Sequence, residues 1–231
     1  MINIQNLSKT YNDTTVLAIE NVEIKRGESI GLVGNNGAGK TTLFSLLLDL
    51  IQVSTGEIHI NGVNVHGSDR WKEFTSSFLD ESFLIGYLTP EEYFYFIGDL
   101  QDVRKQDVDN FITQYDDFFN GEILQKNKYI RDLSKGNQKK VGIIGALIGN
   151  PQLIVLDEPF ANLDPSSQFR LKKLIRDLIQ NREVTILISS HDLSHTVEIS
   201  DRIIALDKGR IIKDIQTSEE TLEELNTLFA V

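Results

Sequence analysis

The segment that most constrains this chain is a glycine-rich loop, Gly34-Asn35-Asn36-Gly37-Ala38-Gly39-Lys40-Thr41. It fits the pattern G-x-x-x-x-G-K-[ST], in which consecutive backbone N–H groups surround phosphates. Glycine allows positive φ and close backbone approach, so several of these groups can converge on one anion. Lys40 can reach β- and γ-phosphates, and the Thr41 hydroxyl can take a place on Mg²⁺. The loop therefore predicts a nucleotide-binding site.

The residues on either side of the loop fit the same interpretation. Residues 29–33 are apolar enough for a buried strand that leads into the loop. After the loop, leucines recur at the spacing of one helix face, at Leu43, Leu46, Leu47 and Leu50. A helix that begins there directs its N-terminus, and so its free N–H groups, at the phosphates. We include Thr42, in the first turn of this helix, among the predicted nucleotide-binding residues.

A second apolar run, residues 153–156, ends in two carboxylates, Asp157 and Glu158. When a strand delivers an Asp beside a phosphate-binding loop, that Asp gives Mg²⁺ a second protein contact, usually through water. The next residue, Glu158, can then polarise the water that attacks the γ-phosphate. This pair predicts hydrolysis of the nucleotide as well as its binding.

Three weaker motifs occupy the rest of the second half. Leu133-Ser134-Lys135-Gly136-Asn137 precedes a helical pattern, Ala161-Asn162-Leu163-Asp164 follows the carboxylates, and His191 follows an apolar strand at 184–188. Each motif alone is weak, because Ser-x-Gly is common and a lone His is more often a structural hydrogen-bonding residue. In this order and at this spacing, they resemble those of the ATP-binding cassette (ABC) transporter ATPase subunits, and the resemblance covers nearly the whole chain.

The resemblance assigns a role to each motif. Residues 34–41 match Walker A, 133–137 the signature, 153–158 Walker B and 161–164 the D-loop. Tyr11 matches the aromatic residue that stacks on adenine, and His191 matches the switch histidine that contacts the γ-phosphate. The alternative for Tyr11 is a half-buried aromatic residue at a strand end, and for His191 a purely structural role.

Two positions depart from the family pattern. Counting back from Leu88-Thr89 places Asp80, followed by Glu81, where the family usually carries a Gln that reaches Mg²⁺ and the γ-phosphate. A carboxylate can still contact Mg²⁺ but cannot donate a hydrogen bond as an amide can. The signature has Lys135 for the usual second Gly and Asn137 for the usual Gln. These features most resemble the ABC-2-type exporter ATP-binding proteins.

The composition excludes several other classes of protein. With 231 residues the chain is long enough for one compact domain, and without cysteine it has no disulfide framework or thiolate chemistry. A net charge of −11 argues against unaided binding to nucleic acid or anionic lipid. The longest apolar stretch, residues 141–149, is far shorter than the roughly 20 residues of a membrane helix. We therefore expect a cytoplasmic protein that is not itself a transmembrane channel.

The fold class that we expect is α/β, with residues 1–231 as a single ABC ATPase domain. Its P-loop NTPase core would have a mainly parallel sheet, preceded by an N-terminal antiparallel β subdomain. Alternating Ile and Val residues near 2–4, 22–24 and 58–60, with an Asn61-Gly62 hairpin turn, indicate that subdomain. Strand signals vanish between 84 and 150, which predicts an inserted helical lobe, and residues 215–231 predict a short acidic C-terminal helix.

An aromatic segment of the lobe suggests a surface for a partner. Thr89-Pro90-Glu91-Glu92 predicts a helix start with a capping box. On that helix we expect Tyr93, Phe96, Ile97 and Leu100 to face the core, leaving Phe94 and Tyr95 exposed, with Tyr87 before the helix. Exposed aromatic side chains indicate a protein interface. The alternative is that these rings form a thick aromatic core under the lobe.

The resemblance implies the function. ATP with Mg²⁺ would bind at Walker A, with Thr41, Asp157 and Asp80 near the metal and Glu158 and His191 as catalytic residues. Ser134 and Gly136 would complete the ATP site of a second ABC ATPase subunit, in a homodimer or a heterodimer. Hydrolysis would power a separate membrane permease, in export by analogy, with this subunit peripheral on the inner face of the membrane. The alternative is a non-transport ABC ATPase, such as a cluster-assembly or regulatory ATPase.

Overall fold

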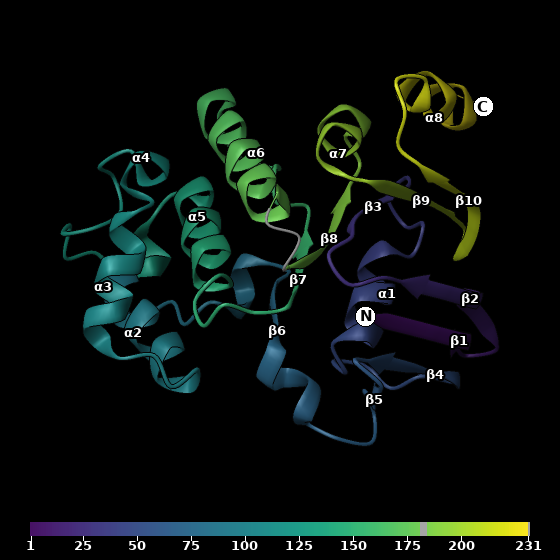
Figure 1. The fold of residues 1–231 in the computed structure, drawn as a ribbon, viewed down its shortest axis with the longest axis horizontal. Coiled ribbons are helices and arrows are strands. Elements are labelled where there is room, and N and C mark those ends of the chain that lie inside the picture. Colours follow the sequence, from purple (N-terminus) through teal and green to yellow (C-terminus); the bar gives the residue numbers. More distant parts are fainter. Residues whose placement is uncertain (181–183, 231) are drawn as a thin grey trace.

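The computed structural model describes residues 1–180 and 184–230, and its strands form two sheets (Figure 1). The smaller sheet is antiparallel, in the order β2 (Thr14–Ile24), β1 (Ile2–Tyr11), β4 (Thr55–Ile60) and β5 (Val63–Asn64). Ile2 lies opposite Ile24 on one side and opposite Ile60 on the other, so apolar side chains share one face. Asn61 and Gly62 form the turn between β4 and β5, both at positive φ. The predicted antiparallel subdomain is confirmed.

The larger sheet is mainly parallel, as predicted. Its order is β10 (Arg210–Gln216), β9 (Arg202–Asp207), β3 (Ser29–Val33), β8 (Thr185–Ser190), β7 (Leu153–Asp157) and β6 (Thr75–Phe78). Among the pairings of this sheet in the described residues, only β9–β10 is antiparallel. Because parallel strands place their carboxyl ends at one edge, the segments after β3, β6, β7 and β8 meet there.

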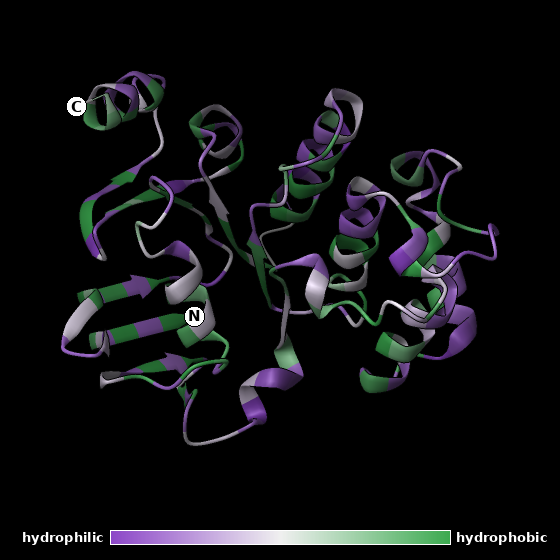
Figure 2. Cartoon of the chain, turned by 180° about the vertical axis from the view of Figure 1, so that it is seen from behind, coloured by the Kyte–Doolittle hydropathy of each residue, from purple (hydrophilic) through white to green (hydrophobic). Residues whose placement is uncertain are grey.

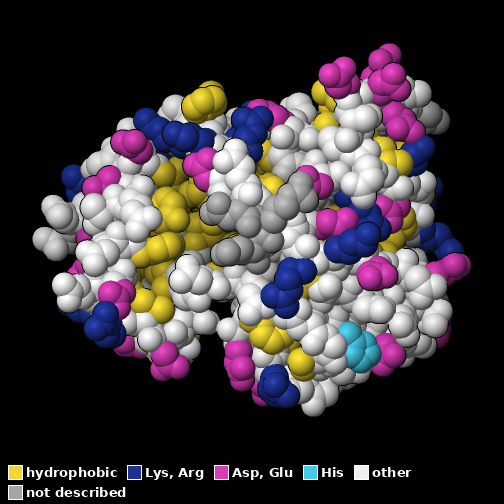
Figure 3. Space-filling view, in the orientation of Figure 1, with side chains coloured by type: hydrophobic (Ala, Val, Ile, Leu, Met, Phe, Trp, Pro, Cys, Tyr) yellow, Lys and Arg dark blue, Asp and Glu magenta, His cyan; other side chains and the backbone are white. Residues whose placement is uncertain are grey.

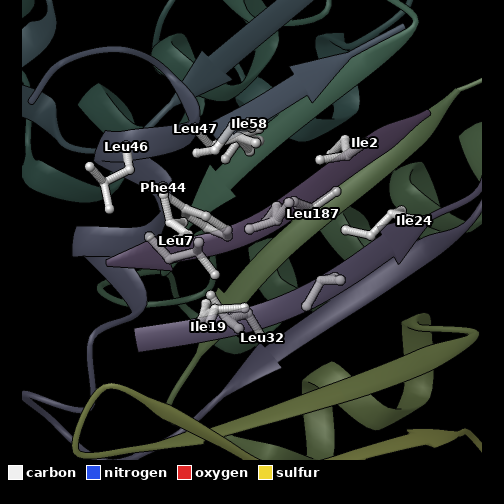
Figure 4. Packing of buried hydrophobic residues seen from close by; sticks show 14 of the residues in the cluster. Ile2, Leu7, Ile19, Ile24, Leu32, Phe44, Leu46, Leu47, Ile58 and Leu187 are labelled. Carbon is white, nitrogen blue, oxygen red and sulfur yellow. The ribbon is translucent and has the colours of Figure 1, made fainter. Parts of the chain in front are cut away.

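Helix α1 (Lys40–Leu47) packs between the two sheets, in the main hydrophobic core. Figure 4 shows Ile2, Leu7 and Ile58 of the antiparallel sheet together with Phe44 of α1 and Leu187 of β8. The hydropathy colours of Figure 2 show the matching alternation along the antiparallel strands. The leucine spacing extends beyond the helix that it predicts: α1 ends at Leu47, and Leu50, at the i+7 position, is exposed.

Between β6 and β7 the chain forms a group of helices on the side of the molecule away from the antiparallel sheet (Figure 1), and their buried residues form one cluster with residues of β7, β8 and the later helices. Its helices are α2 (Pro90–Leu100), α3 (Lys105–Thr113), α4 (Asp116–Phe119) and α5 (Lys135–Gly145). Short 3₁₀ turns lie before β6 at η1 (Arg70–Phe74), after β6 at η2 (Glu81–Phe83) and between α4 and α5 at η3 (Ile130–Asp132). The predicted capping box at Thr89 and Glu92 is confirmed.

The prediction of which residues of α2 face the core is confirmed for Tyr93 and Ile97, which pack on the hydrophobic cluster, and wrong for Phe96, Leu100 and Phe94. Phe94 is 0% exposed and packs on Phe119 with 5.9 Å between ring centroids, whereas Phe96 is 41% and Leu100 64% exposed. Tyr95 is partly buried, and its hydroxyl donates a hydrogen bond to Asp109 at 2.6 Å. The reason is Gly98: a Cβ there would lie 2.6 Å from Val108, so α3 approaches α2 on the face that carries Gly98 and Phe94.

Three further helices complete the chain: α6 (Pro165–Gln180), α7 (Leu193–Ile199) and α8 (Thr221–Phe229). Helix α8 docks through buried Leu225 against Val33 of β3 and Ile203 of β9. It occupies part of the predicted range 215–231, whose last residue, Val231, lies outside the described residues. Hydrophobic side chains gather in a furrow between the helical lobe and α6 (Figure 3), among them Tyr115, Phe118, Leu174 and Leu178. None of the described helices is both long and apolar enough to cross a membrane.

Candidate functional site

An open hollow lies over the loop between β3 and α1. The predicted residues that line it are Tyr11, Asn36, Gly37, Ala38, Gly39, Lys40, Thr41, Thr42 and Glu158. Gly34 is buried at the start of the loop and Asn35 is exposed beside it, both outside this lining. Gly39, the N-cap of α1, has φ 109°, and a Cβ there would lie 3.1 Å from Leu17. A side chain at that position would be strained, which explains the glycine next to Lys40.

Lys40 spans the mouth of the loop. Its side chain is buried, and Nζ donates a hydrogen bond to the Gly34 carbonyl at 2.6 Å. The same nitrogen lies 3.6 Å from Glu158 Oε1. The lysine therefore presents a positive charge beside the backbone of the loop, where it can attract phosphate oxygens.

Thr41 and Asp157 lie side by side at the floor of the site. Thr41 Oγ1 donates a hydrogen bond to Asp157 Oδ2 at 2.7 Å. The hydroxyl of Ser189, at the end of β8, donates to the other oxygen, Asp157 Oδ1. A hydroxyl and a carboxylate are oxygen donors of the kind that Mg²⁺ prefers, and Mg²⁺ commonly takes one or two protein carboxylates together with phosphates. The donor set therefore fits Mg²⁺.

Glu158 follows directly, in an unusual backbone conformation with φ 47°. Its N–H donates to the Ser189 carbonyl at 3.2 Å and to Ser189 Oγ at 3.0 Å. Its carboxylate lies between Lys40 and His191, whose Nδ1 is 2.9 Å from Glu158 Oε2. An acceptor carboxylate and an imidazole therefore stand together at the rim of the phosphate-binding loop.

The profile of the ABC transporter family matches residues 17–161, which is more than half of the chain. The chain belongs to the ABC transporter family. An uncharacterized ABC transporter ATP-binding protein of Methanocaldococcus jannaschii is 33% identical over 91% of this chain and 76% of the relative. This chain is thus an ATPase that binds ATP and the nucleotide-binding subunit of an ABC transporter, as predicted.

Other similar proteins of this family differ in the transport that their names describe. A lipopolysaccharide export system ATP-binding protein of Haemophilus influenzae is 30% identical over 90% of this chain and 87% of the relative. A methionine import ATP-binding protein of Carboxydothermus hydrogenoformans is also 30% identical, over 93% of this chain and 66% of the relative. A solved ATP-binding subunit of an ABC transporter, 25% identical, superposes with a TM-score of 0.83 over 100% of this chain and 93% of that one.

Asp80 and Glu81 of this ABC ATPase line a second hollow, which adjoins the first at Thr41 and Glu158. The exposed Asp80 carboxylate accepts a hydrogen bond from Ser82 N at 2.8 Å, and the bonds from Ser82 lower the pKa of Asp80. Asp80 is therefore ionised at neutral pH and free of any lysine or arginine contact among the described residues, whereas Glu81 lies 3.4 Å from Lys139 Nζ. Of the two, Asp80 is better placed to contact a cation.

Ser134 and Gly136 do not line either hollow. Ser134 is exposed and is the N-cap of α5, where its hydroxyl accepts a hydrogen bond from Asn137 N at 3.2 Å. Gly136 packs on the loop after Glu158, since a Cβ there would lie 2.9 Å from the Asn162 carbonyl. The structure therefore does not bring these two residues to the loop that contains Lys40.

Sequence reasoning missed two residues next to Glu158. Ser189 joins Asp157 to the Glu158 N–H group, and Lys139 donates to the Glu158 carbonyl. The apolar strand before His191 held a signal for the first, because Ser189 and Ser190 are polar residues at the end of a buried strand. For Lys139 the signal was a lysine one helical turn before the apolar Ile143, on the same face of α5.

Proposed function

We propose that this ABC ATPase hydrolyses Mg²⁺-bound ATP with Glu158 as the general base and transmits the resulting motion to a separate membrane permease. The observation that supports this most is the position of the Glu158 carboxylate, 3.6 Å from Lys40 Nζ and 2.9 Å from His191 Nδ1. A base at the rim of a phosphate-binding loop would lie beside the water that attacks the γ-phosphate.

The residues proposed to bind the nucleotide and its metal line two adjoining hollows. The N–H groups of residues 36–41 and the Lys40 ammonium would offset the charge of the phosphates. Tyr11 is 49% exposed at the edge of this hollow, so its ring is accessible to a base, and Lys9 Nζ lies 4.6 Å from the ring centroid. Thr41, Asp157 and Asp80 would hold Mg²⁺, which supplies positive charge to the β- and γ-phosphates.

In the hydrolytic step, Glu158 would accept a proton from the attacking water. His191 would contact the γ-phosphate, and its hydrogen bond with Glu158 would hold the two side chains in fixed positions relative to each other. Transfer of the phosphoryl group needs little covalent chemistry from the protein, so these residues act by position and charge.

The exposed N-terminus of α5 supports a shared site in a dimer. Ser134 and Gly136 lie at the start of a helix, where N–H groups suit an anion, yet they are absent from the hollow around Lys40. We infer that they contact the γ-phosphate of ATP bound to a second subunit. ATP would then hold two subunits together until it is hydrolysed, a two-state motion that a permease can use.

Exposed aromatic residues near Asp80 support a surface for the permease. Phe83 is 61%, Tyr87 69% and Tyr129 45% exposed. Tyr87 and Tyr129 lie on neighbouring segments, because the next residue of each is joined by a hydrogen bond from Ile130 N to Leu88 O. Such a cluster favours a partner protein. Through this permease the subunit would sit on the inner face of the membrane, with residues 84–150 as its helical lobe.

For the direction of transport we propose export by an ABC-2-type system. The support is the Leu133-Ser134-Lys135-Gly136 signature together with a carboxylate at residue 80. Reconstitution with the cognate permease in vesicles, with ATP added on the side of the ATPase, tests this proposal. Substrate moving away from the ATPase side is expected, and movement toward that side would refute export.

The substitution Glu158→Gln tests the catalytic assignment. It preserves the shape of the side chain and removes the basic carboxylate, so ATP should still bind while hydrolysis falls about 10²- to 10⁴-fold. Turnover at the wild-type rate would refute the assignment of the base.

The same variant tests the shared site. Unhydrolysed ATP should hold Glu158→Gln subunits together, so gel filtration with ATP is expected to show a dimer. Adding Ser134→Arg, which places a bulky side chain against the phosphate of the partner, should return the protein to a monomer. A dimer that persists with Ser134→Arg would contradict the role of α5.

A further inference from the structure

The buried ammonium group of Lys139 joins three segments of the chain beside Glu158. Lys139 lies on α5 and is only 4% exposed. Its Nζ donates a hydrogen bond to the backbone carbonyl of Glu158 at 2.8 Å and lies 3.4 Å from Glu81 Oε1. The nitrogen also lies 5.8 Å from the ring centroid of Phe78, at the end of β6. Lysine is almost never fully buried unless it is paired, so these contacts fix where the ammonium can be.

Both backbone polar groups of Glu158 are held by side chains. The N–H group donates to Ser189 Oγ at 3.0 Å as well as to the Ser189 carbonyl at 3.2 Å, and the carbonyl accepts from Lys139 at 2.8 Å as well as from Ala161 N at 3.3 Å. Between these bonds the residue has φ 47°, in the left-handed region that a residue with a side chain rarely adopts. Such a conformation persists only where the surroundings impose it. The shorter bond on each group comes from a side chain, so Ser189 and Lys139 help to hold the conformation that brings the carboxylate to Lys40 and His191.

We propose that Lys139 is a positioning residue for Glu158, with Glu81 as its counter-ion. The ammonium fixes the orientation of the Glu158 peptide, and through it the direction of the side chain. Glu81 Oε1 is buried and has no hydrogen-bond partner among the described residues, so the neighbouring ammonium is the charge that offsets it. This inference rests on the proposed role of Glu158 as the base.

The same contact connects α5 with the base. The start of α5 packs closely on the loop after Glu158, where a Cβ on Gly136 would lie 2.9 Å from Asn162 O. Ser134, the residue proposed to contact the second subunit's ATP, caps this helix. A shift of α5 when the subunits close would therefore move Lys139 relative to the Glu158 carbonyl. Helix α5 would thus be physically linked to hydrolysis in its own subunit.

A purely structural ion pair between the lobe and the core would give the same contacts, so the test must separate stability from catalysis. Lys139→Met removes the ammonium and keeps the length of the side chain. In the full-length protein, we expect kcat for ATP hydrolysis to fall at least about 10-fold, because small displacements of a catalytic group are costly. The Kd for ATP, measured with a fluorescent analogue, should stay within about twofold, since the phosphate-binding loop is untouched.

The double variant Lys139→Met/Glu81→Gln provides the structural control. It removes the carboxylate that the single variant leaves buried and unpaired, so most of the lost thermal stability should return. The Glu158 carbonyl still lacks the lysine donor and keeps only the longer bond from Ala161 N at 3.3 Å, so kcat should stay low. Recovery of kcat together with stability would overturn the proposal. If Lys139→Met alone does not fold, the double variant compared with Glu81→Gln carries the same test.

A second comparison shows whether Lys139 acts through Glu158. In a Glu158→Gln background, Lys139→Met is expected to change the residual rate by less than about twofold. An equal loss in both backgrounds would overturn the proposal. Normal turnover by Glu158→Gln alone would instead refute the proposed base and its positioning together. A slow Glu158→Gln with a normal Lys139→Met would refute only the role of Lys139.

Discussion

The substitution Ser189→Ala should weaken both the stability and the activity of this ABC ATPase, because one hydroxyl serves two site residues. Ser189 Oγ donates to Asp157 Oδ1 and accepts from Glu158 N at 3.0 Å. Alanine removes both hydrogen bonds and leaves only a small gap. The side chain is fully buried, so water cannot take over the lost contacts.

The size of the loss follows from these two bonds. A hydrogen bond to a charged group contributes about 1.5–3 kcal/mol, and a neutral one about 0.5–1.5 kcal/mol. The Glu158 N–H keeps its contact with the Ser189 carbonyl at 3.2 Å, so the second loss is small. We expect unfolding in urea to show a loss of about 2 kcal/mol. For a chain of this size that corresponds to a fall in Tm of roughly 4–8 °C.

The neighbouring Ser190 offers a matched control. It is also a buried serine at the end of β8, but its hydroxyl accepts a hydrogen bond from Asp192 N at 3.0 Å and has no contact with Asp157 or Glu158 among the described residues. Ser190→Ala should cost about 1 kcal/mol. Its kcat should stay within about twofold, whereas Ser189→Ala should lose about 10-fold. Equal effects of the two substitutions on kcat would refute a positioning role for Ser189.

Further predictions concern nucleotide binding, the metal and the lobe. Lys40→Ala should abolish ATP hydrolysis and weaken ATP binding, and normal turnover in purified protein would contradict its contact with phosphate. Tyr11→Ala should weaken ATP binding by about 1–3 kcal/mol, the worth of base stacking elsewhere; an unchanged Kd would make Tyr11 a packing residue. Asp80→Ala should raise the Mg²⁺ concentration that gives half the maximal rate. If that concentration is unchanged in Asp80→Ala but rises in Glu81→Ala, Glu81 and not Asp80 contacts the metal. Phe94→Ala should cost about 3–5 kcal/mol in urea unfolding, since Phe94 is 0% exposed; a loss below about 1 kcal/mol would contradict its place in the core.

The fold could be predicted from the sequence because its signals are local. Alternation in β1 and β4, the Asn61-Gly62 turn and the strand–loop–helix around Lys40 each depend on a few neighbouring residues. The face of α2 could not be predicted in this way. Phe94 and Phe96 are equally apolar, and the choice between them depends on α3, which approaches at Gly98. Periodicity identifies a helix, but it does not determine which face is buried when aromatic residues occur on all sides of the helix.

The same distinction applies to the candidate site. Motif spacing was enough to name Thr41 and Asp157, which lie 116 positions apart in the chain and 2.7 Å apart in space. It could not find Ser189 or Lys139, because neither belongs to a phosphate-binding pattern and each acts on a backbone group. Their partners lie 31 and 19 positions away, respectively, in different elements. Such contacts follow only from how β7, β8 and α5 pack.

The contacts of Glu158 divide between the two parts of the molecule, and this division bears on how binding and hydrolysis are coupled. Lys40, His191 and Ser189 reach Glu158 from segments at the edge of the parallel sheet, whereas Lys139 reaches it from α5 of the helical group. The residues around the phosphate-binding loop come from the sheet side alone, so ATP can bind whatever the position of α5. Orientation of the base, by contrast, requires α5 to be in place. A subunit built in this way would bind ATP first and reach full hydrolytic activity only when its helical group is seated, which is the order of events that a closing dimer needs.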